Sequence, residues 1–503
     1  MTVSEKTVLF TDLRHIRCGD LEWFSPEGEL LPVVRPPLPQ TESHAALGFQ
    51  PRGIRLAAQP ATKTGPLEQP PPGRVIYEGG MYRSWNVVWE VPPGADARDF
   101  YYTVPSSVTV RYAESDDGFD WRIVADSPLE NPGLVGYDGP TFLVDPHGPA
   151  EERYKMVFCA RPPESERAAL WAAYQELHPR YHEPRMTEYN LQCLYAAVSP
   201  DGLDWKMLSE PLMVHQSDTD TTVYWDEWLE RYVLYTRMYW QERRWIGRAE
   251  SGNFREWGGI EPMVWPELSW PPTTDIYLNA RSVYPGAPQY HLMFPMLYDR
   301  FTQASEVRMY SSSDGIVWFQ VPGGPVISPG AIGAWDSEFI AAGRDLVPFG
   351  SDRIAVPYHG TPFPHKYPRW DNVLESHRVG WVWWQKGRLS AVVADEEGEF
   401  FTFATVPAGR SLRLNARTRG GGEVRVGVIR SERAEGGFHL RDLYSQREEV
   451  AGRSVSDCAA FTGDSLSAPV YWGGNSDIGS ADGEPVTLHF KLRSAELFGF
   501  EWV

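Results

Sequence analysis

A short turn motif recurs along this chain, each time between two strand-like runs. Three copies contain Asp-Gly with a serine before it and a tryptophan shortly after it, and they span residues 115–121, 199–205 and 313–318. A degenerate fourth copy spans residues 250–257. Asp-Gly and Asn-type residues tolerate the positive φ of a tight hairpin, and a tryptophan just beyond the turn can pack on a neighbouring unit. The motif therefore predicts a repeated strand–turn–strand unit.

The spacing of the copies indicates which repeat architecture this is. They recur at intervals of roughly 40 to 85 residues, a range that fits four-stranded propeller blades. Aromatic residues make up 13% of the 503 residues, which suits a large β protein because aromatic rings pack well on pleated surfaces. Residues 73–387 can be cut into five comparable units, so we predict an all-β fold that begins with a five-bladed β-propeller.

The two ends of the chain have other patterns. Residues 1–72 are irregular and rich in proline, which predicts an extended segment that packs on the propeller. Residues 388–503 alternate apolar and polar residues with Gly-rich turns, which predicts an antiparallel β-sandwich. An insertion at residues 167–186 is rich in helix formers and should project from one rim, where it could shape a pocket or a contact between copies of the chain.

Charge and motif content exclude several functions. The net charge of −20 repels polyphosphate, so neither nucleic acid nor an anionic membrane is an expected partner. No apolar run near the N-terminus resembles a secretory signal, and no segment is apolar enough to span a membrane, so we expect a cytoplasmic protein. The four cysteines are too scattered for a metal cluster, although Cys159 and Cys193 lie on neighbouring strands and would either pair or remain as buried thiols. No cofactor motif is found, and we expect neither a cofactor nor a metal.

Acidic residues occupy similar places in four of the five units, upstream of the second strand. In a propeller the first strand of each blade lines the central channel, so residues at its start crowd together at one mouth. Carboxylates that crowd together raise one another's pKa, and glycosidic bond cleavage needs one protonated acid and one carboxylate. A turn or capping role is the alternative for any single one of them. The four residues are Asp138, Asp220, Asp275 and Glu338.

Six further polar residues are expected near the same mouth and are predicted to bind substrate. Arginines there could hydrogen-bond sugar hydroxyls or a substrate carboxylate, or could simply neutralise an acidic channel. A histidine at a strand end could equally be a packing residue. The six lie at the ends of second strands or on first strands, and they are Arg161, Arg237, Arg281, Tyr298, Arg344 and His359.

Together, the turn motif, the strand opening at residues 138–142 and the second strand at residues 154–158 resemble the five-bladed propeller glycoside hydrolases, which include fructosidases, arabinanases and xylosidases. The C-terminal part, with residues 412–416, is similar to a sandwich often joined to such propellers. The resemblance implies three acids on first strands: a nucleophile or base, a transition-state stabiliser, and a general acid that is usually Glu. The chain departs from this pattern because residues 73–77 lack an Asp and the third unit offers Asp220 where Glu is expected.

The sequence thus predicts a glycoside hydrolase that acts on a carbohydrate substrate, with Glu338 as the general acid and Asp138 as the base or nucleophile. One alternative is a glycoside phosphorylase, in which Arg161, Arg237, Arg281 and Arg344 would hold phosphate. Another is a carbohydrate-binding propeller without catalysis, since propellers host many functions.

Overall fold

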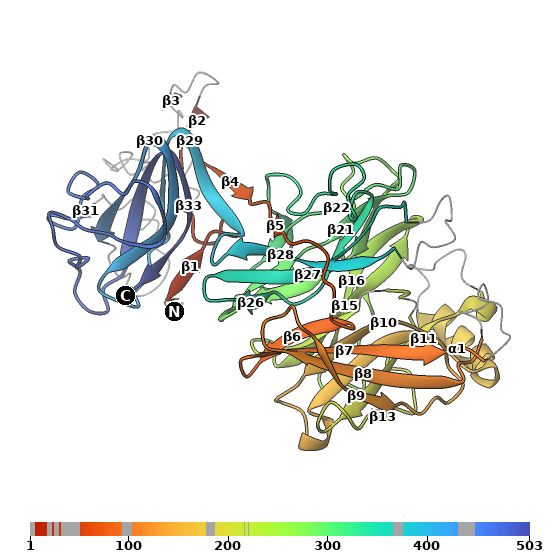
Figure 1. Cartoon of the computed structure of the whole chain (residues 1–503). Helices are drawn as coiled ribbons and strands as arrows, with labels where there is room; N and C mark the ends of the chain where they lie inside the picture. Colours follow the sequence, from red (N-terminus) through yellow and green to blue (C-terminus); the bar gives the residue numbers. More distant parts are fainter. Residues whose placement is uncertain are drawn as a thin grey trace, which may run out of the picture. The chain divides into compact units, whose positions relative to one another are not determined.

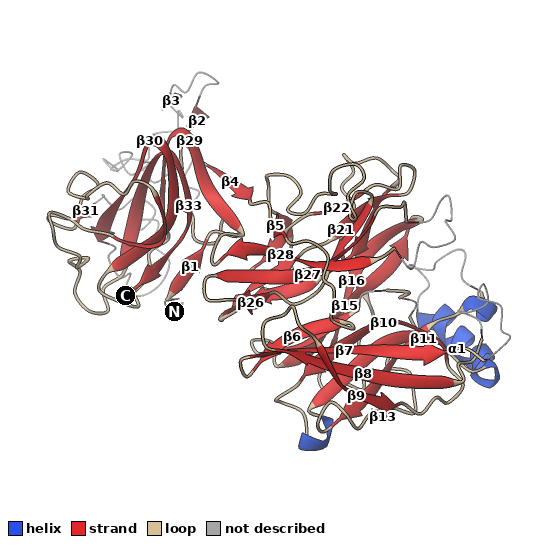
Figure 2. Cartoon of the chain, viewed as in Figure 1, coloured by secondary structure: helices blue, strands red, loops and turns tan. Residues whose placement is uncertain are grey.

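The computed structural model describes residues 6–17, 23–24, 30–31, 51–92, 103–177, 187–215, 217–219, 221–365, 376–430 and 448–503. These residues are almost entirely strands and loops, as predicted, and their α-helix is α1 (Glu164–Leu177), in the expected insertion (Figure 2). No helix among them is long and apolar enough to cross a membrane. Contacts divide the chain into a repeat body, residues 61–320 and 325–383, and a C-terminal body, residues 1–60, 321–324 and 384–503.

The repeat body begins with three antiparallel sheets of four strands each, every one a meander in chain order (Figure 1). Repeat one contains β6 (Arg74–Glu78), β7 (Met81–Glu90), β8 (Ser107–Ser115) and β9 (Arg122–Pro128). Repeat two contains β10 (Val135–Val144), β11 (Tyr154–Arg161), β12 (Cys193–Ser199) and β13 (Lys206–Met207). Repeat three contains β14 (Thr222–Asp226), β15 (Arg231–Trp240), β16 (Arg243–Ser251) and β17 (Glu261–Val264).

Repeat four is split because its first strand breaks at Asn279 and Ala280, and Ala280 has a φ of 41°. One of its sheets contains β18 (Thr274–Leu278), β21 (Met296–Asp299) and β22 (Ser305–Val307). The other contains β19 (Arg281–Tyr284), β20 (Ala287–Met293), β23 (Tyr310–Ser312) and β24 (Phe319–Gln320). Repeat five contains β25 (Phe339–Ala342), β26 (Val347–Phe349), β27 (Arg353–Thr361) and β28 (Arg378–Gln385), and its outer strand is β5 (Thr62–Lys63) from the start of the repeat body.

The recurring turn has one geometry in all its copies. In the first, the backbone N–H of Gly118 donates to Ser115 Oγ at 2.9 Å and Trp121 Nε1 donates to the Gly118 carbonyl at 3.0 Å. The serine of the third copy is Ser312 rather than Ser313, since Ser312 Oγ accepts the glycine N–H. In the fourth copy Phe254, with a φ of 66°, stands where the others have glycine. The motif is therefore Ser-x-Asp-Gly-x-x-Trp, and its degenerate copy at residues 251–257 keeps the positive φ without the glycine.

The glycine carbonyls of these turns also join successive repeats. Trp85 of repeat one donates to the Gly202 carbonyl of repeat two at 2.9 Å, and Tyr235 of repeat three donates to Gly315 of repeat four. Trp381 of repeat five donates to the Gly118 carbonyl of repeat one at 2.9 Å. The last repeat is thus hydrogen-bonded to the first.

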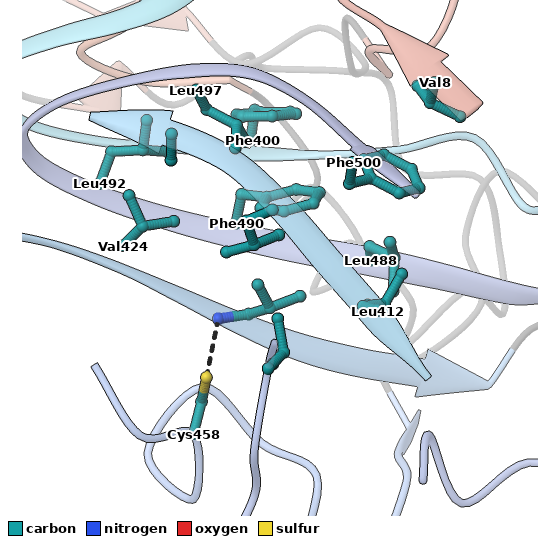
Figure 3. Close-up of a cluster of buried hydrophobic side chains, with 14 of the residues drawn as sticks. Val8, Phe400, Leu412, Val424, Cys458, Leu488, Phe490, Leu492, Leu497 and Phe500 are labelled. Atoms are coloured by element: carbon teal, nitrogen blue, oxygen red, sulfur yellow. Dashed lines mark hydrogen bonds between the residues drawn. The ribbon is translucent and has the colours of Figure 1, made fainter. Parts of the chain in front are cut away.

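The C-terminal body contains one seven-stranded sheet. Its main order is β31 (Glu448–Glu449), β30 (Leu412–Arg430), β33 (Val486–Trp502), β29 (Ser390–Phe401) and β4 (Arg55–Ala58), with β1 (Thr7–Leu9) beside β33 and β32 (Asp464–Pro469) beside β30. Phe400, Phe490 and Phe500 pack together in its core, where Cys458 Sγ accepts the Val426 N–H at 3.3 Å (Figure 3). A separate pair is β2 (Trp23–Phe24) with β3 (Leu30–Leu31).

The N-terminal segment is divided between the two bodies. β1 and β4 pair with β33 and β29 of the C-terminal sheet, whereas β5 pairs with β28 of repeat five. The sequence had instead suggested that the whole segment packs on the repeats. The difference arises because β1 and β4 complete a sheet whose apolar face lies within the C-terminal body.

Candidate functional site

The first strands of the five repeats meet, as their side-chain contacts show. Arg74 of repeat one forms an ion pair with Asp345 of repeat five and donates a hydrogen bond to Thr141 of repeat two. Thr222 of repeat three donates to Asn279 of repeat four at 2.8 Å. These contacts join residues on or beside the first strands of the five repeats.

Arg344 and Ser282 form further contacts between the first strands of the repeats. Arg344 donates to the Thr221 carbonyl at 2.9 Å and to the Pro140 carbonyl at 3.4 Å, so one side chain of repeat five reaches repeats two and three. The Leu346 N–H donates to Ser282 Oγ of repeat four at 2.6 Å. Side chains near the starts of these strands therefore share one environment.

Asp138 lies in this environment, at a bulge of β10 opposite Cys159. Its pKa is raised to about 7, with burial as the largest cause and the nearby charge of Asp218 as the second, while Arg237 and Arg161 act in the opposite direction. A carboxyl group with such a pKa carries a proton in about half of the molecules at neutral pH. Asp138 can therefore donate a proton under conditions in which an ordinary aspartate cannot.

Asp218 precedes β14 and is held in the opposite protonation state. Arg237 forms an ion pair with its carboxylate, and the Tyr239 hydroxyl donates to the same oxygen at 3.1 Å. Burial would raise its pKa, but the charges of Arg237 and Arg244 and these hydrogen bonds outweigh burial and lower the pKa. Asp218 is accordingly a carboxylate across the neutral range, next to a carboxyl group that is often protonated.

Tyr277 of repeat four holds Arg237 of repeat three in place. Arg237 is buried, donates to the Tyr277 carbonyl at 2.5 Å, and has its guanidinium carbon 4.1 Å from the centre of the Tyr277 ring. Arg244 lies 4.9 Å from the centre of that ring. The arginine that pairs with Asp218 therefore has little freedom to leave it.

The other three predicted acids are placed differently. Asp275 is fully buried and pairs with Arg244 at 2.7 Å and Arg300 at 3.5 Å, so it fixes an arginine rather than facing a cavity. Glu338 is exposed and precedes β25. Asp220 lies outside the described residues.

The strand register places Asp138 and Asp275 at positions that are not equivalent. Thr141, Thr222 and Arg281 occupy equivalent positions, because each pairs with the residue three after the aromatic marker of its second strand. Asp138 lies three residues before Thr141, whereas Asp275 lies six residues before Arg281. A count of residues along the sequence does not reveal the bulges of β10 or the break at Asn279. Both change the position of the acid relative to the strand register.

Two of the six predicted binding residues, Arg161 and Arg237, lie at Asp138. Arg281 instead covers the ring of Tyr224, with its guanidinium carbon 3.2 Å from the ring centre. Tyr298 is fully buried and packs edge to face on Tyr277 with ring centres 5.2 Å apart.

The remaining two, Arg344 and His359, lie in repeat five. Arg344 is bonded to backbone carbonyls, as described above. The pKa of His359 is lowered to about 4, with desolvation as the largest cause and His377 and Arg344 as smaller ones.

The sequence analysis missed several residues of the site. Asp218, Tyr239 and Tyr277 were not selected, although Asp218 stands two residues before the chosen Asp220 and Tyr239 two residues after the chosen Arg237. His365 was also missed; its Nε2 is 2.8 Å from the Tyr277 hydroxyl and its ring stacks on Phe339. The period-two spacing of strand residues was the available signal for Tyr239.

No protein-family model matches the chain, and no curated protein matches its sequence. Solved structures are similar to it at low identity. The β-1,2-mannobiose phosphorylase of Listeria innocua is 11% identical, with 65% of this chain and 92% of that chain covered and a TM-score of 0.42. The fructofuranosidase of Schwanniomyces occidentalis is 10% identical, with 88% and 96% covered and a TM-score of 0.37. An N-acetylgalactosamine deacetylase from F. plautii is 14% identical, with 75% and 96% covered and a TM-score of 0.39.

Proposed function

We propose that this protein is a glycoside hydrolase whose two working carboxyl groups are Asp138 and Asp218. The observation that carries the proposal is the pair of neighbouring aspartates with pKa values displaced in opposite directions. Glycosidic bond cleavage needs this division, with one protonated acid and one ionised carboxylate.

In the proposed reaction Asp138 gives its proton to the glycosidic oxygen as the bond from that oxygen to the anomeric carbon breaks. The Asp218 carboxylate either attacks the anomeric carbon or takes a proton from the water that attacks it. Asp138 thereby replaces Glu338 as the proposed acid. Arg237 and Tyr239 are positioning residues, because their contacts hold Asp218 ionised and in place.

We infer that the five repeats form a five-bladed β-propeller over residues 73–387, and that residues 388–503 form a sandwich. The hydrogen bond from Trp381 to Gly118, which joins the last repeat to the first, supports the propeller. The contacts of Arg74 and Arg344, which link the first strands of repeats one, two, three and five, support it as well. For the sandwich, the support is that the long strands β29 and β30 change register midway, at residues 394–397 and 418–423, where one sheet can bend over its core.

A glycoside phosphorylase is the second candidate, and the position of Arg161 and Arg237 beside Asp138 favours it. In that reaction a phosphate oxygen, rather than water, would form the new bond to the anomeric carbon. Arg161 is a buried arginine and is suited to hold the phosphate charge.

Aryl glycosides of several sugars, assayed with and without phosphate, test these proposals. We expect Asp138→Asn and Asp218→Asn each to lower turnover by about 10² to 10⁴. Asp116→Asn is the matched control, since Asp116 is an exposed aspartate in the turn of repeat one. Turnover that depends on phosphate would assign the phosphorylase. Unchanged turnover in both site variants would overturn the assignment, and glycan binding without any turnover would instead indicate a binding protein.

A further inference from the structure

Gln192 is a buried glutamine whose amide oxygen is not hydrogen-bonded. The residue is 5% exposed. Its Oε1 is inaccessible to solvent and has no hydrogen-bond partner in the part of the chain that the structure describes. A buried acceptor without a donor destabilises the folded state, so folded proteins contain few of them, and each one calls for an explanation. A ligand that supplies the donor is one such explanation.

One neighbour of Gln192 leads to Asp138. Gln192 directly precedes β12, and the first residue of β12 pairs with the second-last residue of β11. The same antiparallel register places Gln192 opposite Arg161, the last residue of β11. Arg161 lies two residues beyond Cys159, and Cys159 pairs with Asp138. Because opposite residues and residues two apart share a face of a sheet, Asp138, Arg161 and Gln192 lie on one face of repeat two.

The other neighbour of Gln192 leads to repeat three. The second residue of β12 forms an antiparallel bridge with Met213. The same register places Gln192 opposite His215, which is buried. The Nε2 of His215 lies 2.7 Å from the carbonyl oxygen of Arg237, the arginine that pairs with Asp218. Gln192 therefore lies between two residues that belong to the two halves of the candidate site.

We propose that Gln192 is a specificity-determining residue, which accepts a hydrogen bond from one hydroxyl group of the sugar bound at Asp138; the proposal rests on the glycoside hydrolase function. A sugar hydroxyl is both donor and acceptor, so it can donate to Oε1 of Gln192 and accept from a neighbouring donor such as Arg161. The contact gives selectivity because a sugar without this hydroxyl leaves the buried oxygen without a donor.

Two variants remove the acceptor from its place. Gln192→Met has a side chain of similar length without an amide, and Gln192→Asn keeps the amide but withdraws it by one methylene. The matched control is Gln175→Met, because Gln175 is an exposed glutamine of α1 in the same repeat. Since the oxygen of Gln192 has no donor in the protein, Gln192→Met should melt at the same temperature as the wild type or at a higher one.

The measurement is a cycle that pairs each variant with monodeoxy substrates. The 4-nitrophenyl glycosides of arabinofuranose, xylose, galactose and mannose identify the sugar that the wild type turns over, and each hydroxyl of that sugar is then removed in turn. We expect one deoxy position to lower kcat/KM of the wild type about 10- to 100-fold. Gln192→Met and Gln192→Asn should lose a similar factor on the parent glycoside and little more on that deoxy analogue, whereas the other deoxy positions should add their own losses.

Additive losses at every hydroxyl, or wild-type kcat/KM in both variants, would overturn the role of Gln192. A lower melting temperature of Gln192→Met together with equal losses on all substrates would overturn it as well, because that is the result for a structural residue. The same cycle on Kd values, measured by calorimetry, separates this proposal from the hydrolase. Coupling of Gln192 to one hydroxyl without turnover would reject the hydrolase and keep the role of Gln192, and turnover without coupling would do the reverse. No binding of any of the glycosides would overturn both.

Discussion

The carboxyl groups of Asp138 and Asp218 titrate in opposite directions from an ordinary aspartate, and the charge of Asp218 is one reason why the pKa of Asp138 is high. Burial is the largest cause of the high pKa of Asp138, and the charge of Asp218 adds to it. Asp218 stays ionised because Arg237 and Tyr239 bond it, and its charge then favours the protonated form of Asp138. The two protonation states are therefore coupled.

This coupling predicts a bell-shaped pH profile for kcat/KM. Activity should fall as the pH rises through about 7, because Asp138 loses the proton that it donates. It should also fall below about pH 3.8, the ordinary pKa of an aspartate, as Asp218 becomes protonated. Initial rates on an aryl glycoside from pH 3 to 9 test this. A profile that is flat through pH 7 would mean that another group donates the proton.

Arg237→Gln should move both limbs of that profile to higher pH. The arginine lowers the pKa of Asp218 and also that of Asp138, so its removal lets both values rise. The control is Arg231→Gln on the same strand, because Arg231 is 53% exposed and 3.9 Å from its partner Glu250. A fall in kcat without movement of either limb would indicate that Arg237 has only a structural role.

A buried ion pair outside the candidate site leads to a prediction about the free energy of unfolding. Lys155 Nζ and Asp145 Oδ2 are 2.6 Å apart and both side chains are almost inaccessible, while the Tyr232 hydroxyl of repeat three donates to the same oxygen at 2.6 Å. Lys155→Met should lower the free energy of unfolding by about 3 to 5 kcal/mol, because it leaves a buried carboxylate unpaired. Urea denaturation measures this, with Lys206→Met, an exposed lysine of the same repeat, as the control. Adding Asp145→Asn should recover part of the loss.

The contact between the last and first repeats gives a smaller stability prediction. Trp381→Phe removes the hydrogen bond to the Gly118 carbonyl, while Trp121 keeps its own bond to that oxygen. We expect a loss of about 1 kcal/mol in the free energy of unfolding, the usual value for one such bond. Trp383→Phe, two residues away and only partly buried, should change it less. Equal losses in the two variants would show that ring size, and not the bond to Gly118, is responsible.

Local chemistry predicted the fold far better than it predicted the site. The turn motif worked because each serine, aspartate and glycine acts within a few residues of its neighbours, as in the bond from Gly118 to Ser115. The sequence also predicted that Cys159 and Cys193 lie on adjacent strands, but it did not predict the face of the sheet to which each side chain points. Cys159 pairs with Leu194 and Cys193 with Ala160, so the two thiols point to opposite faces of the sheet and remain free.

Site residues depend on register over long distances. Asp138 was predicted from the sequence because its strand immediately precedes a clear marker at Tyr154. Asp218 was missed because the path of the chain into β14 decides which acid of residues 218–220 lies near Asp138. That path is fixed by Arg237 and Tyr277, which belong to two different repeats.

The pairing of β5 with β28 has a consequence for how the chain folds. Thr62 and Lys63 bond to Trp383 and Val382, so the sheet of repeat five takes its outermost strand from residues synthesised some 320 positions earlier. During synthesis, this short segment must stay available until β28 leaves the ribosome. A cut between β5 and β6 would leave every hydrogen bond of repeat five in place and yet convert its outermost strand into a separate peptide, held only by its contacts.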